Sequence, residues 1–505
     1  MKKVILGAAA LLFSGAMMAQ VSQNALKDTN GNNSVDAQLS VDLSGTGNQG
    51  EAVQTGNTNK LQVLQAGTNQ SSFSIQGDGA GTGDNRARIW QTGDVSGISG
   101  VENAADVRQL GSGNQSTTRQ EGDQNEAVTR QGMKDGGISG GNKAYINHGT
   151  AENGELNYAM VEQDGQGNSS KTVQSYDNNE ARTVQEGDGN MSGIRQKSGP
   201  NGSLGNSALA EQYGNMNATK IYQDGHSQTA ASLQVGNSNK ANQTQLGNGN
   251  WAKVNQGGDT SGPIDNLGSV QADMDGYLNS FADPTYTNGS DNTGNGSKAG
   301  LAKQYQSGDG NSAYSGQWGD DGEDSNYSEQ SQIGDDNRAY VNQNAYGPSN
   351  GGANYGRQDQ AGNGNFAVLG QNGRDHVAYQ RQYGNYNDAT ATQKGKGNLM
   401  SSYQSGDGNV AISAQRGHYN QTLVVQKSGT GDFSGHSFVS SQNVANGMPN
   451  GNGGNTISVL QLGPTGDIMN DGEGCDFQAP SDLDMPGGVG GFDLDAPCTP
   501  STSGC

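Results

Sequence analysis

The sequence predicts an all-β protein, a flat β-solenoid with two strands per coil. Three observations support this prediction: a polar pattern that recurs every eleven residues, strand-like alternation within each copy, and turns rich in Gly. The pattern is clearest in "QLGNGNWAKVNQ", which begins at Gln245 and reads Q-x-G-x-x-N-x-A-x-x-x-Q. Because the closing Gln opens the next copy, the eleven-residue strand-turn units follow one another head to tail.

Each copy contains one strand. Asn250, Ala252, Val254 and Gln256 occupy alternate positions, and alternate side chains of an extended chain share one face. We expect that face to point into the solenoid, whereas the larger Trp251 between them suits the outside. A period of two is typical of strands and not of helices.

The segments between strands are predicted to be turns. They begin with Gln-x-Gly and continue with two residues that are commonly Gly, Asn or Asp. Glycine adopts positive φ without strain, and Asn and Asp also favour turns. Extra residues in some copies fall between the Gln and the next Asn, where a loop absorbs insertions more readily than a strand.

The fixed Gln and Asn positions are expected to form ladders. A buried amide is costly unless it is hydrogen-bonded, and identical amides stacked in register can each donate to one neighbour and accept from the other. This arrangement makes the predicted solenoid cross-β and amyloid-like. The candidate self-assembly ladder consists of Gln54, Asn59, Gln65, Asn114, Gln120, Asn125, Gln163, Asn168, Gln174, Asn179, Gln185, Gln212, Asn217, Gln223, Gln234, Asn239, Gln245, Asn250, Gln256, Gln360, Asn365, Gln371, Gln382, Asn387, Gln393, Asn398, Gln404, Asn409, Gln415, Asn420 and Gln426.

Composition and charge narrow the classes of protein. Only 30% of the chain is hydrophobic and 83 residues are Gly, so a conventional apolar core is not expected, and a repeat is the arrangement that can still order such a chain. The formal net charge is −22. Nucleic acid is therefore not an expected partner, because phosphate binding needs clustered Lys and Arg.

The chain is expected to have six segments. Residues 1–19 read as a signal peptide, with two Lys, a short apolar run and small residues before a cut after Ala19; they predict export, and no segment is long and apolar enough to span a membrane. The others are an N-terminal segment leading into the repeats (20–47), a first repeat block (48–256), a register-breaking insertion or hinge (257–300), a second block (301–463), and a Gly/Pro/Asp-rich tail with three Cys that is mostly disordered or a cap (464–505).

The repeat resembles the curlin repeat, the unit of bacterial curli fibre subunits, over most of the chain. The resemblance implies a secreted structural subunit that polymerises into functional amyloid fibres on the cell surface and supports adhesion and the biofilm matrix. It implies as partners the chain itself in a homopolymer, a nucleating subunit, a dedicated outer-membrane export pore and periplasmic chaperones. The family's fibre-forming Gln and Asn positions correspond here to residues such as Gln223, Asn239, Gln245, Asn250 and Gln256.

The ends of a solenoid predict a mechanism independently of the resemblance. Their backbone N–H and C=O groups lack partners and form a template on which another chain can adopt the same register. In the turns, Asp188, Asp309 and Asp407 are candidate charged gatekeepers that slow premature assembly. The alternative is that Asp is present there only because it forms turns well.

Other functions remain open at this point. A capped, monomeric solenoid would act as a surface adhesin or spacer. The Gly-Asp turns also suggest a calcium-binding solenoid as an alternative, although the known calcium-binding pattern repeats every nine residues and the pattern here repeats every eleven. The five His are scattered, His376 occupies an Asn position of the repeat, and catalytic motifs are absent. We therefore expect no enzyme activity, no cofactor and no metal site.

Overall fold

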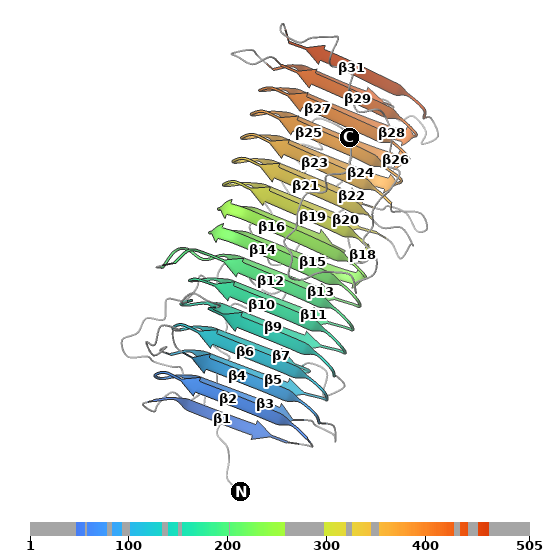
Figure 1. Ribbon diagram of the computed structural model, residues 1–505. Helices are drawn as coiled ribbons and strands as arrows, with labels where there is room; N and C mark the ends of the chain where they lie inside the picture. Colours follow the sequence, from blue (N-terminus) through green and yellow to red (C-terminus); the bar gives the residue numbers. More distant parts are fainter. Residues whose placement is uncertain are drawn as a thin grey trace, which may run out of the picture. The chain divides into compact units, whose positions relative to one another are not determined.

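The structure is a computed structural model, and it describes residues 47–55, 58–77, 83–92, 102–133, 140–149, 154–200, 202–257, 297–319, 326–344, 353–428, 435–442 and 453–463. These residues form β-strands and no helix. The fold is a parallel β-solenoid with two sheets, so the predicted all-β solenoid is confirmed (Figure 1). The chain divides into two compact units, Met1–Thr229 and Ala230–Cys505, which we call unit 1 and unit 2.

Unit 1 contains two parallel sheets, one of odd-numbered and one of even-numbered strands. The odd sheet consists of β1 (Gln49–Gln54), β3 (Ser71–Gly77), β5 (Ala104–Leu110), β7 (Glu126–Gln131), β9 (Tyr158–Asp164), β11 (Glu180–Glu186) and β13 (Ser207–Tyr213). The even sheet consists of β2 (Lys60–Ala66), β4 (Arg86–Thr92), β6 (Gln115–Glu121), β8 (Lys143–His148), β10 (Ser169–Ser175), β12 (Met191–Lys197) and β14 (Ala218–His226).

Unit 2 repeats this arrangement. One sheet consists of β15 (Thr229–Asn237), β17 (Trp251–Gln256), β20 (Ser312–Trp318), β22 (Arg338–Asn344), β24 (Phe366–Arg374), β26 (Asp388–Lys396), β28 (Val410–His418) and β30 (Ser437–Gln442), and the short β18 (Ser297–Lys298) pairs with β15. The other consists of β16 (Lys240–Asn248), β19 (Leu301–Ser307), β21 (Tyr327–Ile333), β23 (Tyr355–Ala361), β25 (Val377–Tyr383), β27 (Leu399–Ser405), β29 (Gln421–Lys427) and β31 (Thr456–Leu462). We call the sheet with β17 the first sheet of unit 2 and the sheet with β16 its second sheet.

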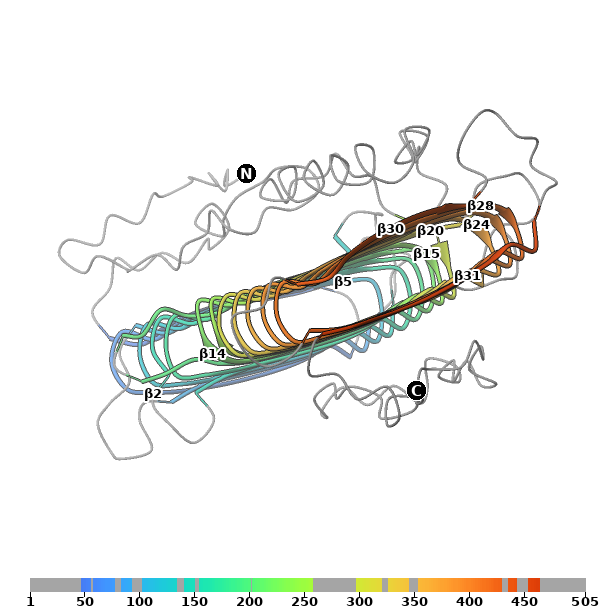
Figure 2. The same ribbon diagram turned by 90° about the horizontal axis from the view of Figure 1, so that it is seen from above.

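Within each unit the chain crosses from one sheet to the other at every turn, so each strand pairs with its equivalent one coil later. Figure 2 shows the two sheets lying face to face, with turns at both edges. Where the turns are tight, paired residues such as Gln174 and Gln196 lie 22 residues apart in the sequence. Where a turn carries an insertion the separation grows but the register holds, as between Gln245 and Gln306, which lie 61 residues apart.

The strands before and after the long sequence insertion pair directly. β16 pairs with β19 and β17 pairs with β20, all within unit 2. The insertion itself is outside the described residues from 258 to 296, as are the signal peptide, most of the N-terminal segment, and the tail with its three Cys. The repeats on either side of the insertion thus belong to one unit.

The interior between the sheets is thin and contains few large apolar side chains. Ala252 and Val254 are fully buried, and small clusters of Ala, Val and Ile recur along the axis, for example Ala127, Ala144, Ile146, Ala159 and Val161. Gln and Asn, together with Ser and Thr such as Thr118 and Thr219, occupy the remaining inward positions, and almost all of these polar side chains are buried. The interior is therefore half polar, and its stability depends on the hydrogen bonds of those amides.

Glycine is required where successive turns approach each other. Gly187 and Gly247 have backbone φ angles of 106° and 107°, which residues other than glycine rarely adopt. A Cβ atom at Gly247 would also clash with the carbonyl oxygen of Gly308 in the next coil. Substitution at these positions would separate the coils.

Candidate self-assembly surface

Two Gln ladders run along the edges of the interior in unit 2. In each ladder, the Nε2 of one Gln donates to the Oε1 of the Gln in the next coil at 2.7 to 3.1 Å. The first ladder contains Gln234, Gln256, Gln317, Gln343, Gln371, Gln393, Gln415 and Gln442, and the second contains Gln245, Gln306, Gln332, Gln360, Gln382, Gln404, Gln426 and Gln461.

The Gln side chains also join the two sheets. Gln256 Nε2 donates to Gln317 Oε1 at 2.7 Å along the ladder and to the carbonyl oxygen of Lys240, in the opposite sheet, at 3.1 Å. Gln371 does the same with Gln393 and with Tyr355 of the opposite sheet, both at 2.9 Å. Both N–H groups of the amide are used, so the ladder fixes the stacking of coils and the pairing of sheets together.

Unit 1 has the same two ladders, with one interruption. The odd sheet carries Gln54, Gln76, Gln109, Gln131, Gln163, Gln185 and Gln212. The even sheet carries Gln65, Gln91 and Gln120, then a break, then Gln174, Gln196 and Gln223. The bonds measure 2.6 to 2.9 Å.

His148 causes the break. It lies in register between Gln120 and Gln174 and is completely buried. Among the described residues, neither ring nitrogen of His148 has a hydrogen-bond partner, and the Oε1 of Gln174 has none either. Burial lowers the pKa of His148 to about 3, so the imidazole is neutral. Sequence reasoning noted this histidine only as scattered and missed that it replaces a ladder Gln.

The predicted Asn residues form a second kind of ladder beside the turns. The Oδ1 of Asn250 accepts the backbone N–H of Asn311 in the next coil at 2.9 Å. Its Nδ2 donates to the carbonyl oxygens of Leu246 at 3.0 Å and Gly308 at 2.7 Å. One side chain thereby satisfies three backbone groups at the start of a strand and closes the turn before it.

His376 takes over the acceptor role of an Asn. Its backbone N–H donates to Asn354 Oδ1 at 3.1 Å, and its Nδ1 accepts the N–H of Asn398 at 3.2 Å. The Nε2 then carries the hydrogen and faces the carbonyl oxygen of Asn372 at 3.2 Å. Burial lowers the pKa of His376 to about 4. The Asn ladder therefore continues through this position, in contrast to the Gln ladder at His148.

A further Gln ladder in the middle of the second sheet of unit 2 was missed by sequence reasoning. Bonds of 2.8 to 2.9 Å connect its five members, Gln243, Gln304, Gln330, Gln358 and Gln380. Each lies two residues before an edge-ladder Gln, so a Q-x-Q pattern in successive copies was the available signal. The corresponding position in unit 1 is apolar in several coils, as at Ile89, Ile194 and Ile221.

The three turn Asp residues bind the backbone of the preceding coil. Oδ1 of Asp188 accepts the N–H of Gln166 at 2.8 Å, and Oδ1 of Asp309 accepts that of Asn248 at 2.8 Å. Oδ1 of Asp407 accepts the N–H of Asn385 at 2.7 Å. The two proposed roles of these residues, gatekeeper and turn former, are thus joined by a third, because each carboxylate links one turn to the next.

Neutral Asn side chains occupy the same turn position in other coils. Asn215 Oδ1 accepts the N–H of Asp188 at 2.8 Å, and Asn363 Oδ1 accepts that of Asp335 at 2.9 Å. The bond between successive turns therefore requires an oxygen at the Oδ1 position of a short side chain, but it does not require a negative charge.

The first coil of unit 1 and the last coil of unit 2 each have a described neighbour on one side only. Apolar side chains are exposed there, with 44% of Val53, 40% of Val63 and 53% of Leu460 accessible. A hollow opens between the sheets at the first coil, lined by residues including Ala52 and Val63. These two coils are the open ends of the described solenoid.

The ladders give these ends opposite chemistry. Every Gln bond runs the same way, from Nε2 to the Oε1 of the following coil, so Gln54 and Gln65 turn acceptor oxygens toward the side with no described coil. At the last coil, Gln442 and Gln461 are acceptors from the coil before them and keep an Nε2 group for the side beyond. In the Gln ladders, therefore, the first coil presents acceptors and the last coil presents donors, whereas the Asn ladders run in the opposite sense, with Oδ1 of Asn420 accepting the N–H of Asn455 in the following coil.

No protein-family model matches this chain, and no curated protein matches its sequence. Within the described ranges there is no helix of the length and apolarity that crossing a membrane requires. Those ranges also contain no group of three or more His, Cys, Asp or Glu placed to hold a metal ion. The ladders and the open ends are therefore the features from which a function can be inferred.

Proposed function

We propose that this protein is a secreted structural subunit of curli-like functional amyloid fibres on the cell surface, where it supports adhesion and the biofilm matrix. The observation that carries the proposal is the set of unidirectional Gln ladders in each unit, interrupted at His148, whose outermost members lie in the exposed first and last coils. In this interpretation the chain is built from eleven-residue strand-turn units with Gly-rich turns, and its flat coils form a cross-β structure.

The fibre grows when the last coil of one chain stacks on the first coil of the next. β30 pairs with β1 and β31 pairs with β2, which places Gln442 against Gln54 and Gln461 against Gln65. The donating end of one ladder then meets the accepting end of another, and the exposed Val and Leu side chains of both coils become buried. Growth is head to tail, because two identical ends would bring Gln oxygens against Gln oxygens, or Gln N–H groups against Gln N–H groups, at both ladder positions.

The remaining parts of the proposal come from the curlin resemblance and the N-terminal sequence. The chain is exported by its signal peptide, passes a dedicated outer-membrane pore with the help of periplasmic chaperones, and begins its fibre on a nucleating subunit. Its function is structural, without catalysis, cofactor, metal or nucleic acid. His148 and His376 replace a Gln and an Asn in the interior, and in this proposal neither histidine has a catalytic or ligand-binding role.

The first test is seeded assembly. The chain without residues 1–19 is diluted from denaturant, and thioflavin fluorescence is followed with and without preformed fibre fragments. We expect a lag that the fragments abolish. A chain that folds and stays monomeric under both conditions would reject the fibre proposal.

The head-to-tail register is tested separately with end variants. Gln54→Leu with Gln65→Leu removes the acceptors at the first coil, and seeded growth should slow by about tenfold or more because buried donors of the incoming coil are left unpaired. Outward-facing Gln62→Leu in β2 is the control, since Gln62 lies between the ladder positions. Equal growth rates for both would contradict the proposed register.

A further inference from the structure

One stretch of unit 2 is basic in an otherwise acidic chain. Residues 366–428 contain six Lys and Arg against three Asp, whereas the whole chain has a formal net charge of −22. Four of the six lie at the C-terminal ends of β24, β26 and β28, where each strand leads into its turn. We call Arg374, Lys394, Lys396, Arg416 and His418 the basic edge.

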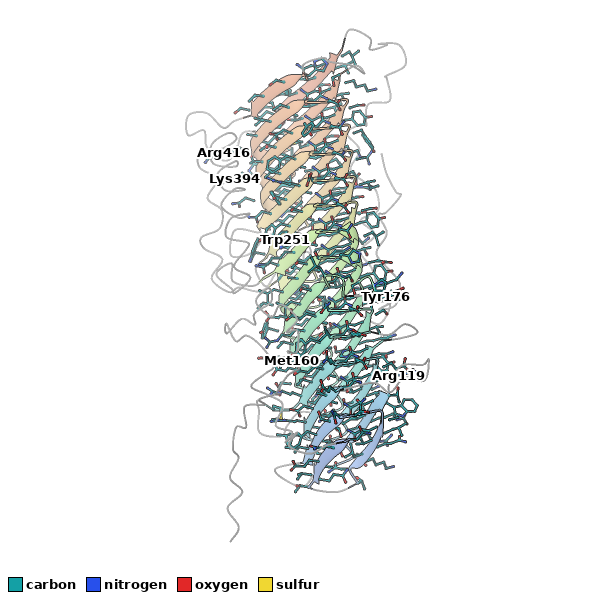
Figure 3. All side chains as sticks on the ribbon, turned by 90° about the vertical axis from the view of Figure 1, so that its left-hand side faces the viewer. Arg119, Met160, Tyr176, Trp251, Lys394 and Arg416 are labelled. Carbon is teal, nitrogen blue, oxygen red and sulfur yellow. The ribbon has the colours of Figure 1, made fainter. Side chains whose placement is uncertain are left out.

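The basic edge is in register. Lys394 pairs with Arg416, and Lys396 pairs with Arg374 on one side and His418 on the other. Figure 3 shows Lys394 and Arg416 one above the other on the same side of the solenoid. Neighbouring strands in a sheet lie ~4.8 Å apart, so the cationic groups form rows with that spacing along the axis.

Backbone bonds between the turns hold these rows in place. The N–H of Gly397 donates to the carbonyl oxygen of Arg374 at 3.0 Å, and the N–H of Tyr419 donates to that of Lys396 at 2.9 Å. The charges are therefore presented by a preorganised backbone, and binding a ligand across several turns would cost little ordering of the protein chain.

The neighbouring basic residues are used differently. Arg357 and Arg381, on the second sheet of the same unit, both bind Asp359, at 2.9 and 3.4 Å. Lys394 and Lys396 form no ion pair with any carboxylate in the described part of the chain. The exposed Asp375 is the one acidic residue in the three turns. Rows of like charge repel one another, so a ligand with repeated negative charges would be favoured there.

An exposed aromatic ring adjoins the cations. Tyr419 is 58% accessible, and the Nζ of Lys396 lies 5.9 Å from the centre of its ring. A flat apolar face with a polar tip suits the C–H face of a sugar ring, whereas a polyanion without rings gains nothing from it. We propose that the basic edge binds a linear acidic polysaccharide, with carboxylates on Lys394, Lys396 and Arg416 and a sugar ring on Tyr419.

The binding site lies within one unit of one chain, so the inference does not depend on fibre formation. The full chain is immobilised and titrated with polygalacturonate, with uncharged dextran as the neutral polysaccharide and polyphosphate as the polyanion without sugar. We expect polygalacturonate to bind with an affinity that falls with salt, and dextran not to bind. Replacing Lys394, Lys396 and Arg416 together by Gln should weaken binding by about tenfold or more.

The control removes the same charge elsewhere in unit 2. Lys298, Arg338 and Lys427 are replaced together by Gln, and the affinity should change by no more than about twofold. Tyr419→Leu should weaken polygalacturonate binding and leave polyphosphate binding unchanged. Circular dichroism of each variant confirms that the sheets are formed.

Three results would overturn the inference. Wild-type protein that does not bind polygalacturonate would reject the site. Equal losses in the two triple variants would show that total charge alone is responsible. Polyphosphate binding that matches polygalacturonate, with both insensitive to Tyr419→Leu, would show a general anion patch and reject the polysaccharide.

Discussion

Gln256 donates its side-chain N–H to Gln317 at 2.7 Å, although 61 residues separate them in the sequence. The bond has the same geometry as those between Gln residues only 22 apart, such as Gln163 and Gln185 at 2.8 Å. The length of the ladder bonds therefore does not depend on how many residues the intervening turns contain. The strands therefore keep their register whatever the length of the turn between them, which is a condition that a template for incoming chains has to meet.

Removing one amide from a ladder should weaken its own coil and the next. Gln371→Leu leaves one N–H of Gln343 and the Oε1 of Gln393 without their ladder partners in a buried site, and it removes the bond to the carbonyl oxygen of Tyr355. We expect the free energy of local opening of β24 and β26 to fall by about 2 to 4 kcal/mol. Amide hydrogen exchange measures it, and Gln421→Leu, at an outward position of β29, is the control. Equal protection in both variants would contradict the ladder's role.

His148→Gln should stabilise unit 1. The new amide would accept from Gln120 and donate to Gln174, whose Oε1 has no partner among the described residues. Completing both bonds should raise the free energy of opening of β8 and β10 by about 1 to 2 kcal/mol. His226→Gln, at the last residue of β14 and outside the Gln ladder, serves as the matched control. A drop in protection on His148→Gln would mean that the ring fills space that Gln cannot.

Acid should destabilise both units through their buried histidines. The pKa values of His148 and His376 are lowered to about 3 and about 4 in the folded chain, whereas an unfolded histidine titrates near 6.5. The unfolded state therefore binds the proton first, and stability present above pH 6.5 is lost as the pH falls toward 4. The loss at pH 5 should be about 2 kcal/mol per histidine.

Unfolding followed from pH 8 to pH 4.5 measures this loss. The variant His148→Gln with His376→Asn should have a flatter profile than the wild type over that range. Asp388 acts in the opposite direction, because burial raises its pKa to about 6 and its stabilising contribution is lost as the pH rises through that value. An unchanged profile in the double variant would contradict the assignment of the acid effect to these histidines.

Two substitutions at Asp309 distinguish the roles of a turn carboxylate. Asp309→Asn removes the charge but keeps an oxygen that can accept the N–H of Asn248, as Asn363 does in its own turn. Asp309→Ala removes both. If the charge delays assembly, Asn shortens the lag in unseeded growth; if the bond matters, only Ala destabilises the fibre, by about 1 kcal/mol. The two readouts are lag time and resistance to denaturant, and no effect of either substitution would reject both roles.

The strands and their inward faces could be predicted from the sequence because each repeat contains the complete alternating pattern. The alternation at Asn250, Ala252, Val254 and Gln256 needs no knowledge of the partner strand, and all four are at most 1% exposed. The central Gln ladder could also have been predicted, since Gln304 and Gln306 repeat as a pair, but the eleven-residue pattern contains only one Gln per copy.

Other features depend on which coils meet. The unpaired ring of His148 becomes visible only when Gln120 and Gln174 are known to flank it. The bond of Asp309 to the backbone of Asn248 likewise requires the turns to be placed one above the other. The basic edge combines residues from the ends of three strands, and none of these charges is notable by itself. Such relations follow from stacking and are absent from any single repeat.

The alternation of strands between two sheets also restricts how such a chain can change length. Because a strand pairs with its equivalent one full coil later, as Gln174 does with Gln196, losing or duplicating 22 residues leaves every remaining rung aligned. Losing half of that would move all later strands into the opposite sheet and bring Gln ladders that had been separate onto one line. Recombination between repeats is therefore tolerated in steps of whole coils, and the length of the molecule is quantised.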